Sequence, residues 1–240
     1  NAPERFVVPN NPLAIDSTEL ILPNSILCYF KVKIDEGLKS CQLMFNNYLS
    51  DTSLCGGNAP DQMKIDYSRR PYTINGMANM FFNQFVAYDL SDWDMSEVVY
   101  AVGMFRNSIN FNQDLSLWDV RKIAAFSGMF AGTPFNQPLN TWKTDSAIAF
   151  EAMFQDCVDF NQPLDKWNTS KVVAFGYMFN NAHSFNQPIG NWDVSSATTM
   201  TYMFNEARAF NQNLNDWDVK KVESMIGLFR NARSFNQPIS

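Results

Sequence analysis

Residues 185–209 read FNQPIGNWDVSSATTMTYMFNEARA, and close variants of this stretch return along most of the 240-residue chain. The six tryptophans of the sequence follow one another at intervals of 25, 24, 25, 25 and 25 residues. They are Trp93, Trp118, Trp142, Trp167, Trp192 and Trp217. The tripeptide Phe-Asn-Gln recurs with the same period from Phe111 to Phe235. A fixed period of this size indicates a repeat architecture, in which each unit buries its apolar side chains only against its neighbours.

The spacing within one unit predicts its secondary structure. Residues 189–194 have the Leu-x-x-Leu-x-Leu spacing of a leucine-rich-repeat strand, with Trp192 at the central apolar position. The apolar residues from Ala197 to Ala207 recur with the spacing of one helix face, after Ser195 as a cap. Valines and glycines at equivalent positions leave an irregular or 3₁₀ segment as the alternative to this helix. The predicted fold class is an α/β repeat solenoid, leucine-rich-repeat-like, with one short strand and one short helical segment per 25-residue coil and stacked parallel strands.

Three regions follow from this pattern. Residues 1–40 are expected to form an N-terminal extended arm and cap, residues 41–85 a degenerate first repeat with an insertion, and residues 86–240 the regular repeats. Strand-forming residues at 20–22 and 26–34 predict strands that either cap the first coil or lie, with the Pro- and Asn-rich segment before them, on a partner. A disulfide between Cys41 and Cys55 and a set of reduced thiols both fit the sequence.

Composition and charge exclude several classes of function. The net charge is −6, and no run of Lys or Arg alternates with aromatic residues, which argues against nucleic acid as a partner. The N-terminal apolar stretches are too short to span a bilayer. No Cys/His pair has metal-ligand spacing, and His183 is the single histidine. We therefore expect no enzyme activity, no catalytic residues, no metal and no cofactor, and small molecules are not the expected ligands.

The repeated polar and aromatic residues are interpreted as structural. The asparagine that follows each repeated phenylalanine is expected to satisfy backbone groups of the turns, and the tryptophans are expected to lie in the core. Acidic residues after four tryptophans (Asp94, Asp119, Asp193 and Asp218) are interpreted as helix caps and not as a calcium ladder. Cys157 occupies a position that later repeats fill with alanine, which predicts a buried free thiol in a small slot under the helix.

A binding surface is expected where the repeats differ from one another. The residue immediately before each tryptophan varies from coil to coil, and on a leucine-rich-repeat architecture this position lies on the face that partners meet. The predicted partner face consists of Asp92, Leu117, Thr141, Lys166, Asn191 and Asp216.

The unit Met-Phe-x-x-Ala-x-x-Phe-Asn-Gln-Pro-Leu-x-x-Trp-Asp-Val-Ser-x-Val resembles the BspA-type surface-protein repeat, a divergent leucine-rich-repeat family. Similar units occur in mycoplasma lipoproteins, in cell-wall proteins of lactic-acid bacteria and in some algae and protists. The resemblance covers about residues 76–240 and departs locally at 86–88, Lys143 and Asn168. It implies a binding and adhesion role at the cell surface, outside the cell or in an organelle lumen, and offers no catalytic residues.

Three functions remain open from the sequence. The first is a non-catalytic protein-protein interaction or scaffolding solenoid, the binding module of an exported surface protein. The second is a structural peripheral subunit of a large complex, such as a membrane complex of an alga. The third is a carbohydrate-binding protein that uses the aromatic ladder. Because the chain starts with Asn1 and not with Met, a mature form left after removal of a targeting peptide is expected.

Overall fold

The computed structural model describes the backbone of three strands (residues 4–7, 17–22 and 29–33) and residues 77–86 and 89–238 in full. The predicted insertion within residues 41–85 and the predicted pairing of Cys41 with Cys55 lie outside the described residues.

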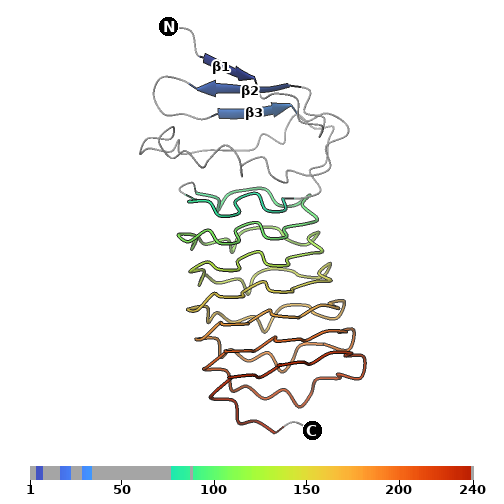
Figure 1. Cartoon of the computed structure of the whole chain (residues 1–240). Coiled ribbons are helices and arrows are strands. Elements are labelled where there is room, and N and C mark those ends of the chain that lie inside the picture. Colours follow the sequence, from blue (N-terminus) through green and yellow to red (C-terminus); the bar gives the residue numbers. More distant parts are fainter. Residues whose placement is uncertain (1–3, 8–16, 23–28, 34–76, 87–88, 239–240) are drawn as a thin grey trace.

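The three N-terminal strands form one antiparallel sheet (Figure 1). Strands β1 (Glu4–Val7), β2 (Ser17–Leu22) and β3 (Tyr29–Lys33) pair in the order β1-β2-β3, with Leu20 opposite Phe6 on one side and Phe30 on the other. The runs rich in strand-forming residues therefore do form strands where the structure describes them. Part of the segment that was expected to be an arm, β1, is also a strand. Its role as a cap stays a prediction.

The repeats form stacked coils, called the coil stack below, in residues 77–86 and 89–238. Figure 1 shows the coils lying one above another from the green to the red part of the chain. Parallel bridges join equivalent residues of successive coils: Tyr100 to Ala125, Ala125 to Ala149, Ala149 to Ala174, Ala174 to Thr199 and Thr199 to Ser224. Each coil therefore lies in register on the next.

The backbone of one coil differs from the predicted strand-plus-helix unit. The described repeats contain no helix, and no strand longer than a single bridge. The predicted strand at 189–194 contains a turn at 190–191, and the bridge residue Thr199 lies in the segment predicted to be a helix. In that segment Tyr202 has a φ of 54° and Glu206 a φ of 56°. Left-handed residues at this spacing interrupt an α-helix. The segment is therefore irregular, which is the alternative to a helix that the sequence left open.

A run of tight turns replaces the helix and links the coils. The N–H groups of Met200, Tyr202 and Phe204 donate to carbonyls of the next coil at 2.8–2.9 Å. The N–H groups of Met203 and Asn205 instead donate within their own coil, to the carbonyls of Met200 and Tyr202. A positive φ at the third residue of such a turn is the geometry of a type II β-turn. The backbone is thus satisfied by alternating bonds within and between coils.

The core consists of columns of identical aromatic side chains. The ring of Trp167 lies 6.3 Å from that of Trp142 and 6.5 Å from that of Trp192, with the planes within 6° of parallel. The rings of Phe154 and Phe160 stack within one coil at 3.9 Å. The predicted burial of the tryptophans is confirmed for five full coils, and Trp217 in the last described coil is half-buried. Because these indole rings lie inside the stack, their ladder is not available for stacking on sugars.

Candidate interaction surface

The repeated asparagines form a polar ladder along one corner of the coil stack. The Oδ1 atom of Asn161 accepts hydrogen bonds from the backbone N–H of Asn186, at 2.9 Å, and from Nε2 of Gln187, at 3.0 Å. The same N–H to Oδ1 bond recurs at each of the five steps from Asn112 to Asn236. The structural interpretation of these residues is confirmed, because each asparagine side chain satisfies a turn N–H of the next coil.

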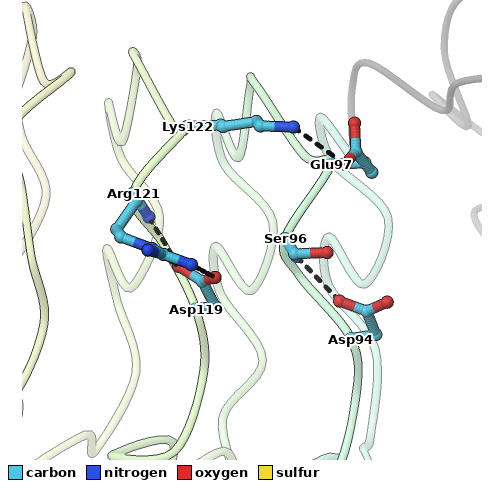
Figure 2. A network of polar contacts seen from close by, with 6 residues as sticks. All are labelled: Asp94, Ser96, Glu97, Asp119, Arg121 and Lys122. Atoms are coloured by element: carbon cyan, nitrogen blue, oxygen red, sulfur yellow. Dashed lines mark hydrogen bonds and ion pairs between the residues drawn. The ribbon is translucent and has the colours of Figure 1, made fainter.

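The acidic residues after tryptophan close turns and do not cap helices. Figure 2 shows Oδ1 of Asp94 accepting the N–H of Ser96, at 2.9 Å. Asp193 accepts the N–H of Ser195 in the same way, and Asn168 replaces an aspartate in an equivalent turn. These are Asx turns, in which a short side chain hydrogen-bonds the backbone two residues further on. The predicted helix-cap role is wrong because no helix follows in the described repeats.

Two ion pairs lie at the turns that follow Trp93 and Trp118 (Figure 2). Lys122 Nζ lies 2.8 Å from Oε1 of Glu97 on the preceding coil, and Arg121 lies 2.6 Å from the carboxylate of Asp119. Hydrogen bonding from the Arg121 side chain lowers the pKa of Asp119 below its usual range. All four side chains are partly exposed, so these pairs contribute little to stability.

Replacing Asp193 with asparagine is expected to weaken the response of the protein to acid. Hydrogen bonds from the side chain and backbone of Ser195 lower the pKa of Asp193, so its stabilising contribution is complete above the pKa of the unfolded chain. That contribution is lost as pH falls through the folded pKa. Asn168 shows that asparagine keeps the turn. Urea unfolding at about pH 7 and about pH 2.5 should show a smaller loss in Asp193→Asn than in wild type. An equal loss in both proteins would contradict this assignment.

Cys157 lies in a closed slot between two coils. Its side chain is fully buried, Sγ donates to the carbonyl of Phe130 at 3.0 Å, and the hydroxyl of Thr133 lies 3.7 Å away. Burial raises the pKa of the Cys157 thiol to about 12. The predicted buried free thiol is confirmed. The slot is formed by turns, because the helix that was expected above it is not present.

We expect Cys157 to resist alkylation in the folded protein. The thiolate is the reactive form, and burial keeps this group protonated at neutral pH. Treatment with iodoacetamide at pH 8, followed by peptide mass spectrometry, should leave Cys157 unmodified in buffer and modify it fully in urea. Modification at the same rate in both conditions would show that the slot is open. Cys157→Ala, which copies Ala182 of the next coil, should keep the fold.

All six residues of the predicted partner face are exposed, at the turn that precedes each tryptophan. Leu117 has 84% of its surface exposed. The Thr141 hydroxyl donates to the carbonyl of Ser116, the Asn191 amide to the carbonyl of Asp165, and the backbone N–H of Lys166 to Oδ1 of Asn140. These contacts join successive coils, so the structure brings the six residues into one column. Their role in binding stays a prediction.

A second surface column was missed in the sequence. It follows the buried slot that holds Cys157, and its first members are Phe85, Ile109, Pro134 and Val158. Ile109 is 79% exposed and Phe85 64% exposed. The sequence signal for this column was the apolar residue that several successive repeats have at one variable position. The expected helix hid it, because every position near the Cys157 slot was assigned to packing.

Two classes of feature are absent from the described part of the chain. Residues 77–86 and 89–238 bring together no group of three or more His, Cys, Asp or Glu side chains that would suit a metal ion. The same residues include no helix of the length and hydropathy that a bilayer crossing requires.

Comparison with known proteins identifies the repeats. The chain matches the family described as "Mycoplasma protein of unknown function, DUF285" over residues 70–167 and again over 150–240. Neither the curated proteins nor the solved structures gave a match. The two matched stretches overlap, cover more than half of the chain and include every tryptophan of the coil stack. The chain therefore belongs to the DUF285 family of repeat proteins.

Proposed function

We propose that this protein is a non-catalytic interaction module, a solenoid that presents its surface columns to another protein. The proposal includes its setting: an exported protein that acts at a cell surface or in an organelle lumen. The family is one of unknown function, so the support comes from the repeats themselves.

The observation that carries the proposal is a difference between two columns: one is constant and buried, and the other is variable and exposed. The column of phenylalanines from Phe111 to Phe210 repeats without change and is fully buried. The column from Asp92 to Asp216 varies from coil to coil and lies on the surface. A stack of this kind holds changing side chains at fixed spacing on a shared scaffold, which is the property that repeat proteins use to build extended binding surfaces.

Cross-linking of the tagged chain in its native source tests the proposal. We expect the chain to elute from a sizing column above its own mass of 27.4 kDa. Cross-links from exposed lysines such as Lys166 should then reach a second polypeptide. Elution as a free monomer, with only internal cross-links, would contradict the proposed function.

The isolated chain separates a binding module from a structural subunit of a large complex. A module should be monomeric and should unfold cooperatively without its partner. An obligate subunit should be insoluble or unfolded when it is prepared alone, because its exposed apolar columns would be permanent interfaces. Size exclusion and thermal unfolding of the purified 240-residue protein distinguish the two outcomes.

A further inference from the structure

One column of the coil stack changes its chemistry from one end to the other. It consists of the residue that follows the buried slot in each coil and is called the ridge below. From the first described coil to the last, its members are Phe85, Ile109, Pro134, Val158, His183, Arg208 and Arg233. The first four are apolar, and the last two are basic.

Backbone contacts show that the ridge is a continuous line from Val158 to Arg233. The residue before each member is buried, from Gln84 at 8% exposure to Ala232 at 9%. In the later coils the carbonyl of each member accepts an N–H from the coil below: Ser184 donates to Val158 and Ala209 to His183, at 3.1 and 3.0 Å. Successive members are therefore one coil apart, about 4.8 Å if the coils keep strand spacing.

The apolar end of the ridge is exposed well beyond what isolated surface residues explain. Phe85, Ile109 and Val158 are 64%, 79% and 40% exposed, and they lie on one line with the half-buried Pro134 between them. Single apolar residues scattered over a surface need no explanation, whereas a contiguous apolar line suggests an interaction site.

The basic end of the ridge keeps a positive excess. Arg208 Nε lies 3.3 Å from Oε2 of Glu206, and Oε1 of the same glutamate accepts a hydrogen bond from the Asn231 amide. One glutamate thus faces Arg208 and Arg233, and Arg230 nearby is exposed as well. The chain as a whole has a net charge of −6, so this end of the ridge is a local exception that favours an acidic ligand.

We propose that the ridge binds an amphipathic helix of a partner protein, an inference that rests on the proposed function. The face of this helix that meets the ridge has apolar residues at one end and carboxylates at the other. The ridge from Phe85 to Arg233 is about 29 Å long, which corresponds to about 19 helical residues. A helical turn rises about 5.4 Å, about 0.6 Å more than the step between coils, so successive turns on one face of a helix stay close to successive ridge residues. An extended strand repeats its side chains on one face every ~6.8 Å and falls out of step.

A synthetic helical peptide of about 19 residues tests this, with leucines on one face of its first three turns and glutamates on the same face of its last two. We expect saturable binding to the full chain by fluorescence anisotropy. Ile109→Asp should weaken binding at least tenfold. Arg208→Glu with Arg233→Glu should weaken it similarly, and a peptide with lysines in place of glutamates should restore it. Ile148→Asp, at an isoleucine that is 45% exposed and lies in neither surface column, should change nothing.

Several results would overturn the ridge assignment. They are no binding at millimolar peptide, equal losses in Ile109→Asp and Ile148→Asp, or no rescue by the lysine peptide. Binding of the protein to phosphatidylserine vesicles without binding to the peptide would point to a membrane surface instead. If the native partner stays cross-linked to Ile109→Asp, the ridge fails while the proposed function stands. If no partner exists in the native source, both fail.

Discussion

Replacing Trp167 with alanine is expected to lower the free energy of unfolding by about 3–5 kcal/mol. The Trp167 indole is 4% exposed and stacks between Trp142 and Trp192. Its Nε1 donates to the carbonyl of Leu139 at 3.0 Å, so the variant loses ring contacts on both sides and leaves a buried carbonyl without this donor. Because each coil contacts only its neighbours, a cavity in the middle of the stack weakens two interfaces at once.

Two further variants show how much of this loss depends on burial of the indole and how much on its hydrogen bond. Trp217→Ala removes the same side chain where it is half-buried and should cost clearly less. Trp167→Phe keeps an aromatic ring but removes the hydrogen bond to Leu139, and should fall between wild type and alanine. Urea unfolding followed by circular dichroism measures all three. Equal losses in Trp167→Ala and Trp217→Ala would contradict a stack whose interior columns are shielded by neighbouring coils.

Replacing Ala152 with proline is expected to disrupt the coil, at a cost of about 3 kcal/mol or more. Ala152 has a φ of 54°, and its N–H donates to the carbonyl of Gly176 on the next coil at 2.8 Å. Proline fixes φ near −65° and has no N–H, so it opposes both features. Thermal and urea unfolding should show the loss. A proline variant as stable as wild type would mean that this turn is not left-handed.

Ala152→Gly is the matched control for the proline variant. Equivalent positions in other coils hold Gly103 and Gly128, both with positive φ. Glycine adopts this region without the strain that a Cβ causes, although it also gives the unfolded chain more freedom. We therefore expect the glycine variant to be as stable as wild type, or more stable by up to about 1 kcal/mol.

The period and the core columns could be predicted from the sequence, whereas the path of the backbone within a coil could not. Trp192 and Phe204 recur because each is buried against its own copy, and a period of identical large residues reveals that directly. The helix predicted from Ala197 to Ala207 was wrong, because apolar residues three apart fit a helix face and a run of tight turns equally well. The distinguishing signal was the glycine or asparagine at the left-handed positions, such as Gly128 and Asn181.

The surface could be predicted only in part. The column from Asp92 to Asp216 was found because it precedes an obvious landmark, and the structure places it on the surface as expected. The ridge was missed because exposure at Ile109 depends on the turn that follows the buried Ser108, and no helical pattern gives that turn. Partner identity is encoded in the partner as much as here, so single-chain patterns cannot supply it.

Cross-linking two engineered cysteines tests the stacked register most directly. Ala149 and Ala174 form a parallel bridge between successive coils, and strand spacing places their Cα atoms about 4.8 Å apart, within the range for a disulfide. After mild oxidation of the Ala149→Cys, Ala174→Cys protein, peptide mass spectrometry should show a 149–174 disulfide in the monomer. The Ala149→Cys, Thr199→Cys protein, with its cysteines two coils apart, should show none. Absence of the first bond, or equal formation of both, would contradict coils stacked in register at this period.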